Sequence, residues 1–436
     1  MGIYKTFLLF PIFKSKNFCQ NIIFNQENFS SRSNETRSLV EALNSVINFE
    51  KVINVTIPKP STFFSNTVVD EIKNNFNLDK IELIIIDCLL SPVQHRNLEK
   101  IFNKKVIDRT QLIIEIFGLR ASTNEGKLQV ELANLSFQKT RLVKSWTHLE
   151  RQRGGLSKVG GPGESQLELD KRMINSKIKQ INKQLIKVKK TRFIQRKRRS
   201  DNQFPIFSLV GYTNSGKSTI FNRLTSSNVL VKDMVFATLD TKMSLINFPN
   251  KNKIILTDTV GFISALPIEL MASFNSSLEE LFSADFLLLV HDLSNLNIEN
   301  QANVVINTLM DIGFSQEVLN KKIINIYNKT DLNSNIPDLN IYNKNKFIKT
   351  SAIKNSGLNS LKKYIEDEIE GDIFTLDFFI PISSPNICSW LFKNSSVLSE
   401  TNKNNDFDGR KLRVKISSYQ LNIFKSNYPD VNINRV

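Results

Sequence analysis

The sequence predicts an α/β protein: a doubly wound, mostly parallel sheet, preceded by a small α/β domain and an antiparallel coiled-coil hairpin. Short apolar runs alternate with helical patterns in residues 1–120 and again in residues 204–370, and such alternation is typical of layered strands and helices. Between these parts, residues 121–200 carry narrow apolar seams at heptad spacing. Residues 371–436 are expected to form a small C-terminal α+β domain, with a strand at 411–416.

The charge and composition of the chain narrow the classes of partner. It has 436 residues, with 58 Lys and Arg against 42 Asp and Glu, a formal net charge of +16. Such an excess favours an anionic partner, nucleic acid first and a membrane surface second. Cys19, Cys88 and Cys388 are too far apart to suggest a disulfide framework. No apolar run reaches the roughly 18–20 residues that a membrane span needs.

The N-terminal residues allow three interpretations. Lys5 precedes a short apolar run, as at the start of a signal peptide, but no small-residue cleavage site follows it. Residues 1–6 also fit a loose myristoylation pattern. An ordinary first strand is preferred, because both targeting patterns are short. In the rest of the first domain we expect strands at 83–87 and 105–108 and helices at 38–49 and 65–75.

Two apolar seams predict the hairpin. Each seam is narrow and has charged surroundings, which favours a hairpin over two ordinary amphipathic helices on a globular core. The seam residues are Leu128, Leu132, Leu135, Leu142, Trp146 and Leu149, then Leu167, Ile174, Ile178, Ile181, Leu185 and Val188. The loop between the seams, residues 154–164, is longer than a helical turn needs and rich in glycine, so we expect its tip to touch a partner.

The second helix of the hairpin ends in a basic run without an acidic interruption. Its residues are Lys187, Lys189, Lys190, Arg192, Arg196, Lys197, Arg198 and Arg199. Such a run is either a solvated face or a contact to a phosphate backbone, and the sequence leaves both open.

A phosphate-binding loop is the most specific local signal. Residues 211–218 match G-x-x-x-x-G-K-[ST] between a predicted strand at 204–210 and a predicted helix, which is the context that the motif requires. The backbone N–H groups would cradle phosphates, Lys217 would reach the β- and γ-phosphates, and the Ser218 hydroxyl would bind Mg²⁺. The residues expected to bind nucleotide here are Gly211, Tyr212, Thr213, Asn214, Ser215, Gly216, Lys217, Ser218 and Thr219.

The chain then continues as strands and helices in alternation. Further strands are expected at residues 254–256, 286–290, 323–327 and 347–349, and helices at 269–282, 298–311 and 358–369. In a doubly wound sheet, the carboxyl ends of such strands line the ligand crevice.

A second motif specifies the base. The residues expected to contact it are Asn328, Lys329, Thr330 and Asp331, with Ser351, Ala352 and Ile353 after the next strand. The Asp331 carboxylate can accept both the ring N–H and the exocyclic amine of guanine, a bidentate contact that adenine cannot offer. Asn328 would tie this loop to the rest of the site, and a backbone N–H after Ser351 would support the base.

Two segments between these motifs are expected to respond to the γ-phosphate. Asp258 ends a strand and can hold Mg²⁺ through water, and the Gly261 N–H can sense the γ-phosphate. Thr238 is placed to close over Mg²⁺, so the predicted metal ligands are Ser218 and Thr238. The predicted catalytic residues are Lys217, Thr238 and Gly261. The two segments comprise Phe236, Ala237, Thr238, Leu239 and Asp240, then Asp258, Thr259, Val260 and Gly261.

Together these motifs predict a P-loop GTPase that uses Mg²⁺ to hydrolyse GTP to GDP and phosphate. Phe262 stands where Ras-like proteins place the glutamine that orients the attacking water, so intrinsic hydrolysis should be slow. Asn214, at the fourth loop position, either holds K⁺ against the phosphates or hydrogen-bonds a switch loop, and both interpretations stay open.

Several stretches resemble the HflX family of GTPases. Besides the GTPase motifs, the resemblance rests on residues 91–99, 106–110, 125–132, 146–151 and 161–168, and the run Gly161, Pro162, Gly163 and Glu164 is the most specific to that family. The resemblance implies a cytoplasmic GTPase that binds the large ribosomal subunit and its rRNA and splits or rescues ribosomes. It also implies a hairpin tip that reaches toward the peptidyl transferase centre. We expect a monomer, with peripheral membrane association as a secondary possibility.

Two other functions compete with this interpretation. One is a GTPase that assists maturation of a ribosomal subunit or RNA, and the hairpin favours ribosome splitting over it. The other is a non-catalytic RNA-binding protein with GTP as a structural ligand. Lys217, Ser218, Thr238 and Asp258 are all present, which argues against the non-catalytic alternative.

Overall fold

The computed structural model describes residues 4–435 except for 14–28, 153–161, 201–203, 226–235, 237–240, 249–252, 265–279, 296, 334–346, 372, 382–383, 405–406 and 430. Contacts divide the chain into two compact units. The first comprises Met1–Ile246 and Lys253–Ser356, and the second Asn247–Asn252 and Gly357–Val436. The division of the sequence into four domains stays a prediction.

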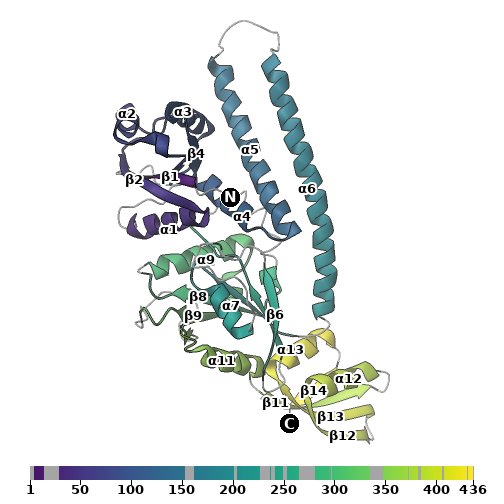
Figure 1. Cartoon of the computed structure of the whole chain (residues 1–436). Helices are drawn as coiled ribbons and strands as arrows, with labels where there is room; N and C mark the ends of the chain where they lie inside the picture. The colour runs from purple at the N-terminus through teal and green to yellow at the C-terminus, as the bar shows by residue number, and fades with distance from the viewer. Residues whose placement is uncertain are drawn as a thin grey trace. The chain divides into compact units, whose positions relative to one another are not determined.

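The N-terminal sheet has the strand order β2-β1-β3-β4 with parallel neighbours (Figure 1). Successive side chains of a strand point to opposite faces, so Leu8 and Phe10 pack with α1 and α4, while Phe7 and Leu9 pack with α2 and α3. Helices therefore cover both faces, as parallel sheets require. The elements are β1 (Tyr4–Phe13), α1 (Phe29–Ala42), β2 (Ser45–Val55), α2 (Asn66–Asn75), the short 3-10 helix Leu78–Lys80, β3 (Leu83–Ile86), α3 (Pro92–Phe102), β4 (Lys105–Asp108) and α4 (Arg109–Arg120).

The helix expected at residues 38–49 is wrong in its second half. α1 ends at Ala42, Asn44 takes a left-handed φ of 59°, and β2 begins at Ser45. Exposed residues alternate with less exposed ones along β2, and its many Val and Ile residues favour a strand. The first strand, the strands at 83–87 and 105–108 and the helix at 65–75 are confirmed.

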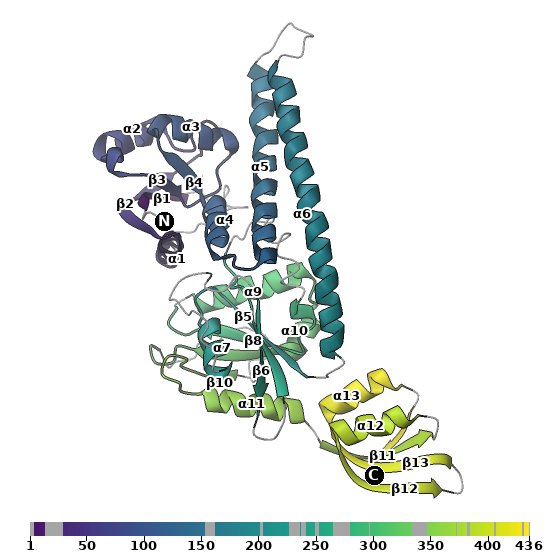
Figure 2. The same ribbon diagram turned by 45° about the vertical axis from the view of Figure 1, so that its right-hand side comes forward.

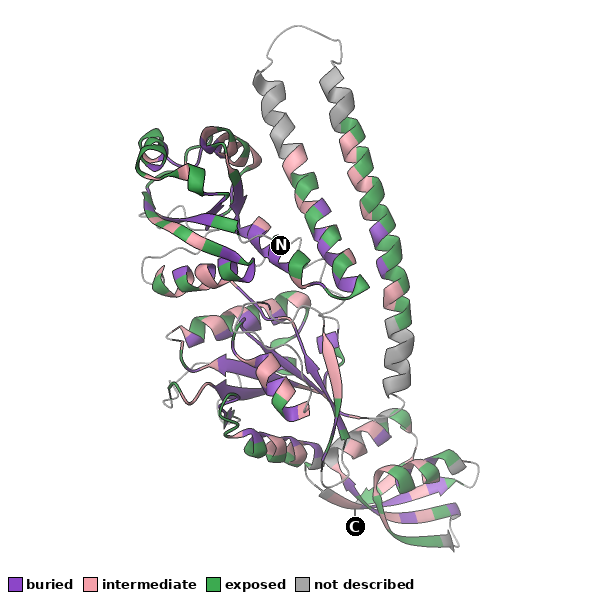
Figure 3. Ribbon diagram, in the orientation of Figure 1, coloured by how far each residue is buried: buried purple, intermediate pink, exposed green. Residues whose placement is uncertain are grey.

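Two long helices, α5 (Asn124–Gln152) and α6 (Pro162–Ser200), pack against each other. The cluster between them contains the predicted seam residues Leu128, Leu132, Leu135, Ile174, Ile178, Ile181 and Leu185. Val130 and Ala133 of α5 pack into the core of the first unit instead, and many of the other described residues of the two helices are exposed (Figure 3). The prediction that the loop extends to residue 164 is wrong, because α6 already begins at Pro162. Proline is favoured in the first turn of a helix. The side chains of Trp146, Leu149 and Leu167 and the tip at 153–161 lie outside the described residues.

The second sheet of the first unit has the order β10-β9-β8-β5-β7-β6. β5 pairs in parallel with both β8 and β7, so the strand order reverses at its carboxyl end, where doubly wound sheets bind ligands. The elements are β5 (Ile206–Gly211), α7 (Lys217–Thr225), β6 (Lys242–Asn247), β7 (Lys253–Asp258), β8 (Phe286–Asp292), α9 (Ile298–Ile312), α10 (Gln316–Lys322), β9 (Ile323–Asn328) and β10 (Phe347–Lys349). The five predicted strands and the helix at 298–311 are confirmed, while most of the helix expected at 269–282 lies outside the described residues.

The second unit contains a sheet of order β12-β13-β11-β14 whose neighbours are antiparallel. α12 and α13 lie on one face of it (Figure 2). The elements are α11 (Leu358–Glu370), β11 (Ile373–Pro381), α12 (Pro385–Asn394), β12 (Ser396–Asn404), β13 (Phe407–Ser417), α13 (Ser418–Asn427) and β14 (Asn432–Arg435). The expected α+β tail, the strand at 411–416 and the helix at 358–369 are confirmed, and the β-α-β-β-α-β order is that of a ferredoxin-like fold.

Candidate functional site

The phosphate-binding loop connects β5 to α7. Gly211 has a φ of 152°, and a Cβ there would lie 2.5 Å from the Val290 carbonyl oxygen. Gly216 has a φ of 95°, and its Cβ would lie 2.2 Å from Asn328 Nδ2. Both positions require glycine, because any side chain would meet another part of the site.

Lys217 is buried at the start of α7, beneath the loop. Its Nζ donates to the carbonyl oxygens of Gly211, at 3.1 Å, and Tyr212, at 2.7 Å. Burial lowers the pKa of Lys217 to about 8, although Asp258 partly opposes the shift. A Cβ on Gly261 would lie 3.1 Å from this ammonium group, so the predicted phosphate-sensing glycine and the predicted phosphate-binding lysine are neighbours.

The next residue of α7 lies against the end of β7. The Ser218 hydroxyl donates to Asp258 Oδ2 at 2.7 Å. A hydroxyl beside a carboxylate provides the hard oxygen ligands that Mg²⁺ prefers, so these residues fit the predicted ion. Thr238, the other predicted ligand, lies outside the described residues, as do Ala237, Leu239 and Asp240.

One asparagine joins three segments of the site. Asn328, at the end of β9, donates from Nδ2 to the Ser215 carbonyl oxygen at 2.9 Å. Its Oδ1 accepts from the Ala352 N–H at 3.1 Å and from the Thr350 hydroxyl at 3.2 Å. The predicted tie between the base-reading loop and the phosphate-binding loop is therefore present.

The predicted guanine-reading carboxylate is held by the following loop. The Ser351 hydroxyl donates to Asp331 Oδ1 at 2.5 Å, and this hydrogen bond lowers the pKa of Asp331. Lys329, at a φ of 63°, forms an ion pair with Asp292 at 2.8 Å. Ile353 is largely exposed. Asp331 is therefore an oriented carboxylate at the edge of the site.

The segment after Gly261 is fixed to the phosphate-binding loop through its backbone. The Thr213 N–H donates to the Phe262 carbonyl oxygen at 2.7 Å, and the Phe262 N–H donates to the Gly211 carbonyl oxygen at 3.1 Å. The Phe262 ring is buried in the core, so it cannot orient a water molecule.

Several other predicted nucleotide-binding residues have side chains engaged elsewhere. Phe236 packs its ring against Phe117 of α4, with centroids 4.5 Å apart. The Thr259 hydroxyl donates to the Leu209 carbonyl oxygen at 2.6 Å, and Val260 packs against the core. Only the backbones of these residues remain for contact with a nucleotide, because their side chains stabilise the fold.

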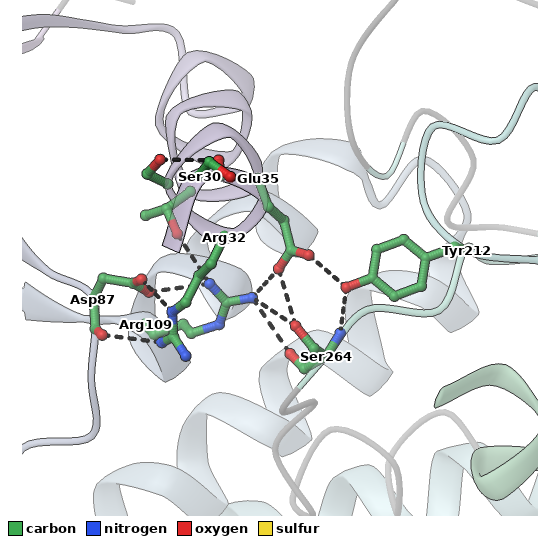
Figure 4. Close-up of polar contacts among 9 residues, drawn as sticks. Ser30, Arg32, Glu35, Asp87, Arg109, Tyr212 and Ser264 are labelled. Carbon is green, nitrogen blue, oxygen red and sulfur yellow. Dashed lines mark hydrogen bonds and ion pairs between the residues drawn. The ribbon is translucent and has the colours of Figure 1, made fainter. Parts of the chain in front are cut away.

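The sequence did not point to a contact between the N-terminal sheet and this site (Figure 4). The Tyr212 hydroxyl donates to Glu35 of α1 and accepts from the Ser264 N–H at 3.0 Å, and the Ser264 hydroxyl donates to Glu35 Oε1 at 3.2 Å. Glu35 also pairs with buried Arg109, whose other carboxylate partner is Asp87 at 3.0 Å. No local pattern marks Glu35, and 177 positions separate it from Tyr212.

A polar cavity of about 400 Å³ opens beside the phosphate-binding loop. Exposed Asn214, with a left-handed φ of 60°, lies in its wall. The lining residues come from α1, the loop and the segment after β8: Ser30, Ser31, Asn34, Glu35, Ser38, Tyr212, Thr213, Asn214, Asp292, Ser294, Asn295, Asn297 and Gln301.

A phosphate-binding loop at the switch point of a mostly parallel sheet, with the base-reading motif beside it, defines a P-loop GTPase. Family profiles agree: residues 206–329 match one described as "50S ribosome-binding GTPase", residues 30–118 match "GTP-binding GTPase N-terminal", and residues 120–199 match "GTP-binding GTPase Middle Region".

Curated relatives extend the match to most of the chain. GTPase HflX of Escherichia coli is 35% identical over 92% of this chain and 93% of its own length. That of Caldanaerobacter subterraneus is 39% identical over 80% of this chain and 78% of its own. That of Magnetococcus marinus is 48% identical over 62% of each. The chain belongs to the HflX family of GTPases and is a GTP hydrolase. Among the described residues, no helix has both the length and the apolar character to cross a membrane.

Proposed function

We propose that this GTPase, in its GTP-bound form, binds the large ribosomal subunit in the cytoplasm and splits whole ribosomes. The observation that carries the proposal is the connection between hairpin and site. α6 ends at Ser200 and leads into β5, the strand that ends in the phosphate-binding loop. Because α6 connects almost directly to this strand, a conformational change in the loop can be passed on to the hairpin. The match to ribosome-binding GTPases indicates that the partner is the ribosome.

Six of the predicted site residues have distinct parts in GTP binding and hydrolysis. Lys217 places a positive charge on the β- and γ-phosphates, and the Gly261 N–H binds the γ-phosphate. Ser218 and Thr238 would hold Mg²⁺, and Asp258 would support the ion from beside Ser218. The ion supplies charge neutralisation at the phosphates. Asp331 selects guanine, and hydrolysis to GDP releases the segments that held the γ-phosphate.

A monovalent cation is proposed to assist this site. Phe262 is buried and offers no group to stabilise the developing charge. Asn214 is exposed beside the polar cavity, where its amide oxygen can bind K⁺. Hydrolysis should be faster in potassium than in sodium at equal ionic strength, and Asn214→Ala should remove the difference. Equal rates in the two salts with the unaltered chain would contradict the role of K⁺.

Sedimentation of purified ribosomes tests the proposed function. With this protein and a non-hydrolysable GTP analogue, whole ribosomes should separate into subunits. With GDP, or with Lys217→Ala, they should stay whole, because the γ-phosphate contact is lost. Binding to isolated large subunits without any splitting would favour assistance of subunit maturation instead.

A further inference from the structure

Within the described part of the second unit, α12 and α13 cover one face of the C-terminal sheet, and no helix covers the other. Alternate residues of its central strands, such as Phe378 of β11 and Val414 of β13, are buried with α12 and α13. The residues between them belong to the opposite face. We propose that this opposite face, the open face, binds single-stranded RNA. The site is separate from the nucleotide site and from the hairpin, and the inference does not rest on the proposed function.

The strand register defines the residues of the open face. Phe379 is paired with Lys411, Asp377 with Arg413 and Thr375 with Lys415 across β11 and β13. The outer strands add small, exposed polar side chains: Ser399 and Thr401 from β12, and Asn432 and Asn434 from β14. The two central strands, β11 and β13, thus place one aromatic ring and three cations on the open face.

A cation lies over the aromatic ring of the open face. Lys411 Nζ lies 5.4 Å from the centroid of the Phe379 ring. In one common class of RNA-binding domain, aromatic residues on the exposed face of a four-stranded sheet stack on unpaired bases. A base that stacks on Phe379 would displace the Lys411 ammonium from the ring, and its phosphates would lie near Lys411, Arg413 and Lys415, because these cations follow one strand.

An acidic residue holds two of these cations in position. Asp377 accepts from Arg413 at 2.8 and 3.1 Å and forms an ion pair with Lys411 at 2.9 Å. These contacts lower the pKa of Asp377 to about 2, so it is ionised at neutral pH. Three cations against one carboxylate leave the face positive, which suits an anionic chain. RNA fits better than an acidic peptide, because a base can also stack on Phe379.

Binding of a fluorescent single-stranded oligouridylate to the full chain tests the proposal. Lys411→Gln with Lys415→Gln should weaken binding about 5–10-fold and flatten the salt dependence, by about 0.7 in slope for each lost phosphate contact. The matched control is Lys393→Gln with Lys425→Gln, which removes the same charge from exposed positions on α12 and α13. It should leave both quantities unchanged. Equal losses in the two variants would refute a local site.

Two further variants separate a binding role from a structural one. Asp377→Asn removes the negative charge and frees the two cations, so affinity for the oligonucleotide should rise. Phe379→Leu keeps an apolar side chain but removes the stacking surface, so affinity should fall about tenfold while the affinity for polyglutamate is unchanged. Tighter binding of polyglutamate than of oligouridylate would assign the face to an acidic protein instead. No change in oligonucleotide binding in either variant would overturn the proposal.

Discussion

Single side chains join the loops of the nucleotide site, and Asn328 is the clearest example. Asn328 Nδ2 lies against Gly216, where a Cβ would come within 2.2 Å, while the same amide hydrogen-bonds Ser215 and Ala352. The phosphate loop and the base loop are thus packed onto one side chain. Asp331 needs a separate support, which Ser351 provides.

Asp331→Asn is expected to move the base preference from guanine toward xanthine. The amide presents a donor where guanine also has a donor, so a charge-assisted bidentate contact is lost. The loss should cost about 1.5–3 kcal/mol in GTP binding. Titration with GTP and XTP measures the change, and Asp311→Asn at the exposed end of α9 serves as the control. Unchanged GTP affinity would contradict this assignment.

The protein is expected to take up a proton on Lys217 when it binds GTP at alkaline pH. The pKa of Lys217 is lowered to about 8, so the side chain is protonated below pH 8 and increasingly neutral above it. Phosphates favour the ammonium form, so GTP affinity should fall as pH rises through about 8. Calorimetry at pH 9 in buffers of different ionisation enthalpy should show proton uptake, and at pH 6.5 none from this group. Absence of uptake at pH 9 would count against the assignment.

At the scale of elements, continuous apolar runs made the sheet of the GTPase domain predictable. β9 is buried throughout, and its run of Ile residues is visible in the sequence. β6 has only Ile246 buried, and α10 is a single short helix, so neither left a pattern that distinguishes it from a loop. The prediction of a helix at 38–49 was wrong in its second half. The β-branched residues there favour a strand, and Asn44 takes a left-handed conformation that ends the helix.

The site was predictable to the extent that it is local in sequence. The ties of Asn328 and the pair of Ser218 and Asp258 follow from motifs with fixed positions in the fold. The contact of α1 with the phosphate loop does not, because Glu35 and Tyr212 meet only through tertiary packing. A tyrosine at the second position of the loop does not by itself predict a contact with α1.

Loss of the Glu35 carboxylate is expected to loosen the phosphate loop. In Glu35→Gln, the Tyr212 hydroxyl and Ser264 lose a charged acceptor, whose hydrogen bonds are worth about 1.5–3 kcal/mol. Hydrogen exchange should therefore rise about tenfold or more at the Ser264 amide, which is held by Tyr212. Glu50→Gln is the control, because Glu50 forms an exposed pair with Arg37 in the same part of the chain. Identical exchange in both variants would show that the contact has no such effect.

Across the whole molecule, regions that fold on different principles have different tasks. The GTPase domain buries strands on both faces and positions a nucleotide at their ends. α5 packs against the core of the first unit through Val130 and Ala133, and α5 and α6 are joined by the seam around Leu135, Ile181 and Leu185. Most described residues of α6 are exposed or half-buried and add little to a core, which is why we assign the hairpin to contact with a large partner.

The central claim is that the hairpin tip makes this GTPase a ribosome-splitting factor. The most direct test replaces residues 154–161 by a short glycine-serine turn and compares the variant with the unaltered chain in sedimentation of ribosomes with a non-hydrolysable GTP analogue. We expect the variant to hydrolyse GTP at the same rate without ribosomes and to leave ribosomes whole. Subunits released by the variant as completely as by the unaltered chain would contradict the claim and reduce the hairpin to a spacer.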